Sequence, residues 1–535
     1  MVCEIWIDKV DVGGRKVELE KNSVICVVGP NSSGKSSLLS AIFARVTGRK
    51  NLERASALVE ASIDHNIDQA GIAEFMNANT VIDKNGRVIW YGGQETVGSN
   101  VDKWTENWAN NPKISPNFIS AFIHRIPTEN RLNASASTNH IDPLTHAPNH
   151  PSIYLYRNPE LEEQLNLAAE KLFGISVCLN PGMGQKIGLH VGKYRGRLQN
   201  RTQEYANEII KYPLLEHEGD GVRAALGLVS HIISFKHNCI LVDEPDLYLH
   251  PPQAYSLAKQ MVELVSEHQL IVASHSARYV QGLVENASER LQLVRLDRNQ
   301  VGVSVDLVDT SVFSEIKKDP VLRFTEIVDA LFYRELILTE NPADCMLYKT
   351  ALDECGFSQA NDETLWLGCY GKHAFPKFVR VARALALSPL VVADFDILSP
   401  IGNSHEKVLA PLLLAYGEDQ TELMKDLENI HNSVKSNADL NWNQLKKNGL
   451  ECLKPYGALH GRLESFLEAL KRIGILVIKE GELESLHSPR LEKSHGVETV
   501  NAMLEYDINS DGLKPLVRFV GELASRLDFK EDSKP

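Results

Sequence analysis

Short, almost wholly apolar runs recur in the first half of the chain, at residues 2–7, 24–28, 240–242 and 270–273. Runs of this length that are rich in β-branched residues are typical of buried strands, so we expect a largely parallel sheet. Apolar residues recur at helical spacing over 38–46 and 252–268, which predicts two helices. The second helix lies between the last two strands, and these three segments are expected to form a βαβ unit.

The pattern of buried strands starts again after about residue 319. It predicts strands at 336–339, 390–393 and 475–478 and a helix at 345–352. Residues 406–471 are polar and favour helices, which indicates a helical insertion over about 402–471. We therefore expect two α/β domains, the first over 1–312 and the second over 320–527.

Two further segments lack periodicity. Residues 133–152 are rich in Asn, Ser, Thr, His and Pro and are expected to form a loop within the first domain. His140, His146 and His150 lie there, but no cysteine or acidic cluster accompanies them, so we interpret them as loop residues and not as a zinc site. Residues 528–535 form a charged tail that we expect to be disordered.

The composition is that of an ordinary globular protein, with 535 residues, 43% apolar and 24% charged. No stretch approaches the roughly 18 unbroken apolar residues of a membrane span, and the N-terminus lacks a secretion-signal pattern. We expect no membrane association and a cytoplasmic location.

The 8 cysteines are spaced singly, which predicts reduced core residues. With a formal charge of -14, any contact with nucleic acid requires local basic patches or bound metal.

Residues 29–36, Gly-Pro-Asn-Ser-Ser-Gly-Lys-Ser, fit the phosphate-binding loop GxxxxGK[ST] between an expected strand and an expected helix. Backbone N–H groups of such a loop and the N-terminus of its helix attract phosphate oxygens. Lys35 would bridge the β- and γ-phosphates, and the Ser36 hydroxyl would bind Mg²⁺. The loop residues assigned to ATP are Gly29, Pro30, Asn31, Ser32, Ser33, Gly34, Lys35, Ser36 and Ser37.

Two carboxylates follow the apolar strand at 240–242. Asp243 is expected to complete the Mg²⁺ shell through water, and Glu244 to polarise the attacking water as a general base. Ligands bind at the carboxyl ends of strands in open α/β sheets. The acidic pair and the phosphate loop together predict ATP binding and hydrolysis.

In this order the motifs resemble those of ABC-type ATPases of the SMC and RecF kind, over about residues 1–312. Residues 246–251 resemble the D-loop of these proteins, and His275 resembles their switch histidine. Gln94 is the candidate for their Q-loop.

Gly219, Asp220 and Gly221 lie where these proteins keep the signature motif, although the sequence departs from the common LSGGQ form. The signature motif of one cassette covers the nucleotide of another in this family. Since the chain has one set of motifs, the resemblance implies a homo-oligomer, at least a dimer.

Further carboxylates follow the strands expected in the second domain. Glu340 and Asp344 follow strand 336–339, and Asp394 and Asp396 follow strand 390–393. In an extended strand the last two would point to the same side. Hard cations such as Mg²⁺ or Mn²⁺ need several carboxylate oxygens, and two ions can stabilise the attacking and leaving oxygens of phosphodiester cleavage.

These carboxylates resemble the metal site of a Toprim domain, in which a Glu after the first strand and an Asp-x-Asp after a later strand converge. Gly371 and Lys372 resemble a glycine-lysine step of Toprim nucleases in the OLD family. The resemblance implies catalytic roles for Glu340, Asp394 and Asp396, and metal binding by Glu340, Asp344, Asp394, Asp396, Glu482 and Glu484. Lys493 is the candidate for the catalytic lysine.

Asn341 stands where the family usually has glycine after its first Glu. Asn tolerates the left-handed backbone better than most residues, so we expect the turn to survive.

An ABC-type ATPase followed by a Toprim domain resembles OLD-family nucleases, among them the nuclease subunit of the gabija anti-phage system. The resemblance implies an ATP-regulated, divalent-metal-dependent nuclease that acts on DNA or RNA in anti-phage defence. It also implies self-assembly and a partner effector or sensor protein.

Two other interpretations stay open. One is an ATP-gated scaffold whose inactive Toprim domain binds or restrains a partner, which Asn341 leaves open. The other is a RecF-like repair ATPase, although such proteins need no Asp-x-Asp domain. A basic run could either track a phosphate backbone or form a solvated face; it comprises Lys186, Lys193, Arg195, Arg197 and Arg201.

Overall fold

The chain divides into two compact units, Met1–Thr310 and Ser311–Pro535. The sequence placed the boundary near residue 312. The computed structural model describes residues 3–49, 57–68, 70–72, 74–75, 80–82, 88–90, 95–96, 119, 122–141, 150–180, 185–192, 203–234, 237–287, 289–298, 302–417, 419–491 and 497–527. The expected disordered tail at 528–535 lies outside these residues.

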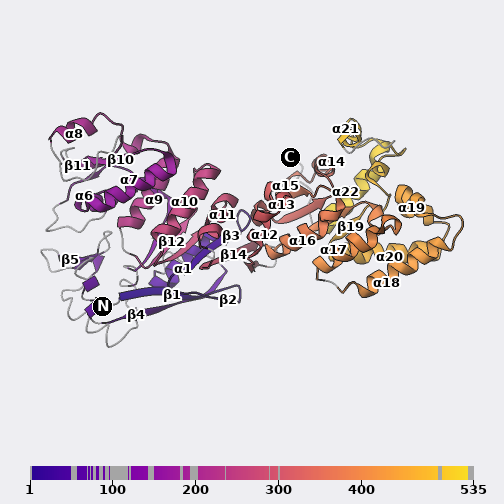
Figure 1. The fold of residues 1–535 in the computed structure, drawn as a ribbon, viewed down its shortest axis with the longest axis horizontal. Helices are drawn as coiled ribbons and strands as arrows, with labels where there is room; N and C mark the ends of the chain where they lie inside the picture. The colour runs from indigo at the N-terminus through magenta and orange to yellow at the C-terminus, as the bar shows by residue number, and fades with distance from the viewer. Residues whose placement is uncertain are drawn as a thin grey trace. The chain divides into compact units, whose positions relative to one another are not determined.

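A six-stranded sheet forms the centre of the first unit (Figure 1). Its order is β15 (Val303–Val308), β14 (Leu291–Arg298), β3 (Val24–Val28), β13 (Gln269–Ala273), β12 (Cys239–Asp243) and β8 (Ile123–Ile126). All neighbours run parallel except β14 and β15. Every residue of β3 and β13 is buried, as the continuous apolar runs predict. The strands expected at 24–28, 240–242 and 270–273 are confirmed.

Helix α1 (Lys35–Thr47) packs between this sheet and a second, antiparallel sheet. The second sheet has the order β2 (Arg15–Glu18), β1 (Cys3–Val12) and β4 (Leu58–Ile67). Leu39 and Ile42 of α1 share one buried cluster with Ile5 and Ile7 of β1 and with residues of β3, β12 and β13. The predicted helix at 38–46 and the first strand are confirmed, but the antiparallel sheet was not predicted.

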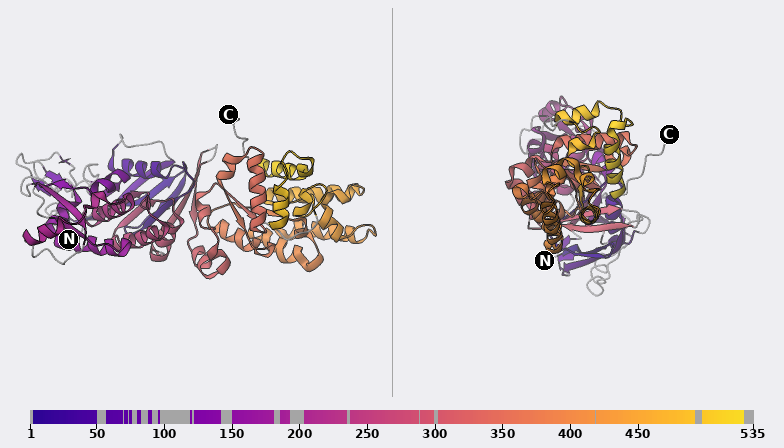
Figure 2. Two further views of the ribbon diagram at one scale, coloured as in Figure 1. Left: turned by 90° about the horizontal axis from the view of Figure 1, so that it is seen from above. Right: turned by 90° about the vertical axis from the view of Figure 1, so that its right-hand side faces the viewer.

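Further helices lie on the opposite face of the central sheet (Figures 1 and 2). They include α5 (Thr128–Ala134), α7 (Pro159–Phe173), α9 (Asp220–Ser234), α10 (Pro251–Leu264) and α11 (Ala277–Ala287). Helix α10 joins the parallel strands β12 and β13, which confirms the βαβ unit.

Short elements complete the described part of the first unit. One small sheet has the order β10 (Val177–Asn180), β11 (Lys186–Val191) and β9 (Thr138–Asn139), and another has β5 (Thr80–Ile82), β6 (Val88–Trp90) and β7 (Glu95–Thr96). Two further helices are α6 (Pro151–Arg157) and α8 (Gln203–Ile209).

The loop expected over 133–152 is wrong in part. Helix α5 ends at Ala134, β9 occupies two of the positions, and α6 starts at Pro151. The side chain of His150 accepts a hydrogen bond from the N–H of Ser152 and caps α6, so polar and proline residues here begin a helix. Residues 142–149, with His146, lie outside the described residues.

The second unit contains a four-stranded parallel sheet. Its order is β17 (Thr364–Gly368), β16 (Glu335–Thr339), β18 (Leu390–Ala393) and β19 (Ile475–Val477). Helices α14 (Pro342–Glu354), α21 (Val497–Leu504) and α22 (Lys514–Arg526) bury apolar side chains against β16, β18 and β19. The strands predicted at 336–339, 390–393 and 475–478 and the helix at 345–352 are confirmed.

Other helices of this unit are α12 (Val312–Lys318), α13 (Pro320–Phe324), α15 (Ser358–Asp362) and α16 (Phe375–Ala384). Between β18 and β19 the chain is almost entirely helical, as expected for the insertion. Its helices are α17 (Ala410–Ala415), α18 (Gln420–Lys435), α19 (Trp442–Asn448) and α20 (Gly457–Ile473). No helix among the described residues is both long enough and apolar enough to cross a membrane.

Candidate functional site

The phosphate-loop sequence forms the turn between β3 and α1. Gly29 has φ 144°, and a Cβ atom there would lie 2.0 Å from the carbonyl oxygen of Leu296, so only glycine fits. Gly34 has φ 100° and precedes the first helical residue, Lys35. The predicted strand, loop and helix are confirmed. Pro30, Asn31, Ser32 and Ser33 complete the turn, and Ser36 and Ser37 belong to the first turn of α1.

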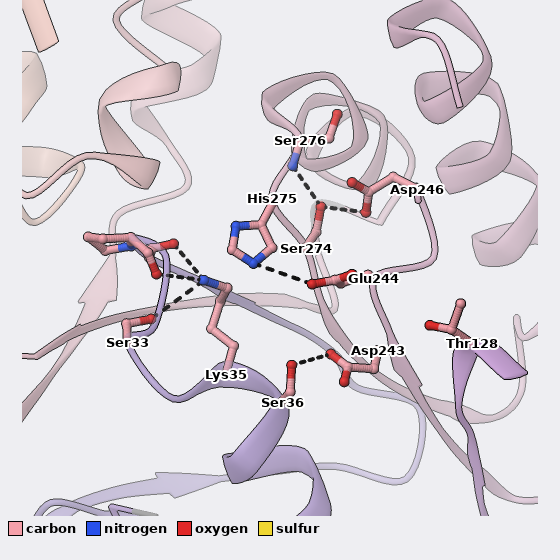
Figure 3. A network of polar contacts seen from close by, with 12 residues as sticks. Ser33, Lys35, Ser36, Thr128, Asp243, Glu244, Asp246, Ser274, His275 and Ser276 are labelled. Atoms are coloured by element: carbon pink, nitrogen blue, oxygen red, sulfur yellow. Dashed lines mark hydrogen bonds and ion pairs between the residues drawn. The ribbon is translucent and has the colours of Figure 1, made fainter. Parts of the chain in front are cut away.

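Lys35 is buried and points back into the loop (Figure 3). Its ammonium group donates hydrogen bonds to the carbonyl oxygens of Gly29 and Pro30, at 2.7 and 2.8 Å. Burial lowers the pKa of Lys35 to about 8, while Glu244 and Asp243 oppose this change. The group is therefore mostly protonated at neutral pH, as a phosphate-binding lysine must be.

Ser36 and Asp243 meet although they come from distant parts of the sequence. The Ser36 hydroxyl donates a hydrogen bond to Oδ1 of Asp243 at 3.0 Å (Figure 3). Burial raises the pKa of Asp243, and the bond from Ser36 opposes the rise. The fold thus brings together the hydroxyl and the carboxylate that the sequence proposed for one Mg²⁺.

Glu244 follows β12 directly and has a left-handed backbone with φ 48°. Nε2 of His275 lies 3.6 Å from Oε1 of Glu244 (Figure 3). Burial and the charge of Lys35 lower the pKa of His275 to about 4, so the imidazole is neutral near pH 7. Beside them, the Ser274 hydroxyl donates to Oδ1 of Asp246 at 2.8 Å, which ties the expected D-loop to the end of β13.

Arg131 supports the acidic pair and was not predicted. Its side chain is fully buried, and its guanidinium donates to the carbonyl oxygens of Glu244 at 2.8 Å and Asp243 at 3.1 Å. A third bond reaches Oγ1 of Thr128 at 2.7 Å. The arginine therefore fixes the backbone that carries both carboxylates. No motif marks Arg131 in the sequence, since the preceding strand β8 reads Ile-His-Arg-Ile and lacks a continuous apolar run.

The expected signature residues Gly219, Asp220 and Gly221 lie at the N-terminus of α9. Asp220 forms an ion pair with Arg223 at 2.8 Å. A Cβ atom on Gly221 would lie 2.5 Å from the carbonyl oxygen of Tyr248, which belongs to the expected D-loop. The two segments are therefore in close backbone contact. This contact requires glycine at position 221.

In the second unit, carboxylates gather at the carboxyl ends of β16 and β18. Glu340 follows β16, and Asp394 follows β18. The expected strand geometry for Asp394 and Asp396 is wrong, because β18 ends at Ala393 and Asp396 lies in a 3-10 helix, Phe395–Leu398. The end of β18 positions Asp394, and the 3-10 helix positions Asp396. The alternation of side chains along a strand does not bring the two carboxylates together.

Three cations surround this cluster. Nζ of Lys372 lies 2.6 Å from Oδ2 of Asp396. Nζ of Lys446, from α19 of the insertion, lies 3.1 Å from both Asp396 and Glu482. Arg490 forms an ion pair with Glu482 and lies 4.0 Å from Glu484. Lys446 and Arg490 were missed, since no motif marks them and the fold alone brings them to the cluster.

The carboxylates influence one another electrostatically. Burial raises the pKa of Glu340, and Asp396 adds to the rise while Lys372 opposes it. Burial together with the neighbouring charges of Glu340 and Asp396 raises the pKa of Asp394 well above its ordinary value. Burial raises the pKa of Asp344 to about 6.

Within the described ranges, no three His, Cys, Asp or Glu side chains stand close enough together to hold a metal ion. Oδ1 of Asp396, however, is buried without a hydrogen-bond partner.

Asn341 does not adopt the expected left-handed conformation. Its φ is -132° and its ψ 157°, and it is the N-cap of α14. The N–H of Asn341 donates to Oδ2 of Asp344 at 2.9 Å, and the two side chains form a reciprocal capping box. An extended N-cap needs no glycine, so the departure from the family pattern has a local structural reason.

Several predicted residues cannot be placed. Gln94, Lys493, Lys193, Arg195, Arg197 and Arg201 lie outside the described residues. Lys186 is exposed at the start of β11. The ring of His140 packs edge-on against Tyr156 at 5.0 Å between ring centroids.

Comparison with known proteins finds a family model that matches part of the chain. Residues 196–280 match the family model described as an AAA ATPase domain, and this range includes α9, the acidic pair and His275. Old nuclease of Escherichia phage P2 is 23% identical over 175 residues, which are 32% of this chain and 30% of the phage protein. The match thus spans less than a third of that relative.

Solved structures also resemble the chain. The SMC head domain from Thermotoga maritima is 16% identical with a TM-score of 0.31, covering 58% of this chain and 99% of that one. The cbiO1 protein from Clostridium perfringens, part of the ABC transporter complex cbiONQ, is 11% identical with a TM-score of 0.26, covering 52% and 82%. The match to the AAA ATPase model and the similarity to Old nuclease confirm the predicted resemblance to OLD-family ATPases.

Proposed function

We propose that this protein is an ATP-regulated, divalent-metal-dependent nuclease of the OLD type that acts in anti-phage defence. The observation that carries the nuclease assignment is that Glu340 and Asp394 follow the neighbouring parallel strands β16 and β18, with Asp396 in the 3-10 helix after β18, so that the three carboxylates influence one another electrostatically. The similarity to Old nuclease of phage P2 supports the same assignment.

ATP hydrolysis is assigned to the first unit. Lys35 would hold the phosphates, while Ser36 and Asp243 would hold Mg²⁺. Glu244 would orient the attacking water, with His275 beside it. Arg131 would keep both carboxylates in position through their backbone oxygens. We propose the Asp220 and Gly221 segment as the signature contact to ATP on a second copy, which requires at least a dimer.

The carboxylates of the second unit are of the type that a hard divalent cation takes, but no three of them among the described residues stand close enough together to hold one, so binding would require the side chains to close around the ion. Glu340, Asp344, Asp394 and Asp396 supply carboxylate oxygens, and the unpartnered Oδ1 of Asp396 is an acceptor that a cation would satisfy. A bound ion would supply Lewis acidity to a phosphodiester. Lys372 and Lys446 would then release Asp396 and become available to phosphate oxygens, and Glu482 and Glu484 would supply further ligands.

The ion pairs of Lys372 and Lys446 with Asp396 also suit the second candidate function. In that case the carboxylates are neutralised internally, the domain is catalytically inactive, and the protein is an ATP-gated scaffold for a partner effector. The capping role of Asn341 removes the sequence argument for this alternative.

A cleavage assay separates the two. Plasmid DNA, linear DNA and transfer RNA are incubated with the protein in Mg²⁺ or Mn²⁺, with and without ATP, and with EDTA as the metal-free control. We expect metal-dependent cleavage of at least one substrate. Absence of cleavage from every reaction, with ATPase activity intact, would favour the scaffold.

The oligomer is tested separately by light scattering. We expect dimers or larger particles, and ATPase activity that rises with protein concentration. A monomer with concentration-independent specific activity would remove the basis for a signature contact in trans.

A further inference from the structure

Tyr370 is an exposed aromatic residue at the edge of the carboxylate cluster. Its side chain is 68% exposed, and its backbone is left-handed with φ 59°. This conformation costs a non-glycine residue on the order of 1 kcal/mol. Within the part of the chain that the structure describes, the ring takes part in no aromatic contact. Neither burial nor local packing accounts for a tyrosine here.

The backbone on both sides of Tyr370 is fixed to the site. The N–H of Cys369 donates to the carbonyl oxygen of Thr339, and the N–H of Gly371 donates to that of Glu340, both at 2.9 Å. Tyr370 is therefore held beside the residue that begins the carboxylate cluster. Its ring projects into solvent from a segment with a defined position.

The cationic side chain of Lys372, two residues further along, faces the same cluster. Its Nζ lies 2.6 Å from Oδ2 of Asp396. Phosphate oxygens are attracted to such groups. If a phosphate of the substrate lies at Lys372, the attached base is within reach of Tyr370, two residues earlier in the chain.

We propose that Tyr370 is a stacking platform for an unpaired nucleobase next to the phosphate at the carboxylate cluster. The substrate class is then a nucleic acid with a single-stranded segment at the cleavage point. Every base has a π-face that can stack on an aromatic ring, so the contact is independent of sequence. In an intact duplex these faces are covered by neighbouring bases. This inference rests on the proposed nuclease function and narrows its substrate.

Binding is measured by fluorescence anisotropy with a labelled single-stranded DNA and with its blunt duplex, in Ca²⁺. Base stacking on an aromatic side chain predicts that Tyr370→Ala binds the single strand about 5- to 150-fold more weakly. Tyr370→Phe keeps the ring and should bind like wild type, which also excludes a role for the hydroxyl. Tyr370→Gly removes the ring and also the strain of the left-handed backbone. Its affinity for the single strand should equal that of Tyr370→Ala. Affinity for the duplex should not change in any variant.

Phe324→Ala is the matched control, since this aromatic side chain of the same unit is 85% exposed and lies outside the cluster. It should leave the affinity unchanged. Equal single-strand affinity of wild type, Tyr370→Ala and Tyr370→Gly would overturn the proposal, as would equal losses on single strand and duplex. If wild type binds single strands through Tyr370 but cuts nothing in Mg²⁺ or Mn²⁺, the nuclease assignment fails and the stacking site stands.

Discussion

The carbonyl oxygen of Arg131 lies 1.9 Å from the point where a Cβ atom on Gly227 would stand. Gly227 belongs to α9, the helix that begins with the expected signature residues. Arg131 belongs to α5 and binds the backbone of Asp243 and Glu244. Because Gly227 has no side chain, α9 can lie close to the backbone of Arg131. This close packing helps to position the arginine that binds the backbone of the acidic pair.

Gly227→Ala should therefore push α5 away from α9 and disturb the acidic pair. Overpacking of this kind costs about 1 to 3 kcal/mol of unfolding free energy. We expect a lower Tm and reduced ATP turnover, measured by thermal unfolding and by phosphate release. Gly521→Ala is the control, because this glycine lies in helix α22 of the second unit and a Cβ atom there meets nothing within 4 Å. A Gly227→Ala protein with the stability and turnover of wild type would contradict the proposed packing constraint.

Lys35→Ala should abolish ATP binding, whereas Glu244→Gln should keep binding and lose hydrolysis. The lysine supplies charge to the phosphates, while the glutamate acts on the water only. Equilibrium binding of a fluorescent ATP analogue and phosphate release measure the two effects. Equal ATP affinity of wild type and Lys35→Ala would refute the assignment of this loop.

Asp394→Ala and Asp396→Ala should each eliminate nucleic-acid cleavage and leave ATP hydrolysis largely intact. Loss of one carboxylate from a hard-cation site lowers metal occupancy, so a phosphodiester loses its Lewis acid. In the proposed function, ATP hydrolysis relies instead on Ser36 and Asp243, which belong to the other unit. Cleavage and phosphate release are measured on the same preparations. If both variants cut as well as wild type in Mg²⁺ and in Mn²⁺, the proposed nuclease site is wrong.

Stability of the first unit should fall as the pH drops from about 6.5 towards 4. Burial lowers the pKa of His231 on α9 to about 4, with His150 and His237 adding to the decrease and the carbonyl of Asn130 opposing it. The rings of His124 and His237 stack at 4.5 Å between centroids, and burial also lowers the pKa of His124. In this pH window the unfolded chain binds more protons than the folded one, so acid favours unfolding.

The slope is about 1.4 kcal/mol per pH unit for each such histidine. Urea unfolding across this window measures it. In His231→Gln the free energy of unfolding should fall less steeply as the pH decreases. His217→Gln changes an exposed position and should keep the slope of wild type. Equal slopes of unfolding free energy against pH in wild type and His231→Gln would show that this histidine does not cause the loss of stability in acid.

Sequence patterns predicted the parts of the fold whose signals are local. Continuous apolar runs marked β3, β12, β13, β16 and β18, and the loop pattern marked the turn that follows β3. The antiparallel sheet of β1, β2 and β4 was missed, because β4 has no buried residue and therefore no apolar run that would mark it, and it lies far along the chain from its partner β1.

The candidate sites were predictable only where a motif carries the chemistry. Lys35, Asp243 and Glu244 follow from spacing, but Arg131 acts through backbone oxygens, which leave no residue-type signature. Lys446 reaches Asp396 from the insertion, a contact that depends on how α19 packs. Asn341 was misjudged because a capping box and a left-handed turn both accept asparagine.

The order of strands in the second unit determines when its sheet can close during synthesis. Strand β18 pairs with β16 on one side and with β19 on the other, yet the whole helical insertion separates β18 from β19. One edge of β18 therefore stays open until the ribosome has made residue 477, and α22 reaches the core later still. The insertion helices make local contacts and can fold in the meantime. An open apolar strand edge invites pairing with other chains, so slow synthesis through the insertion would prolong the stage at which the nascent protein is most prone to aggregate.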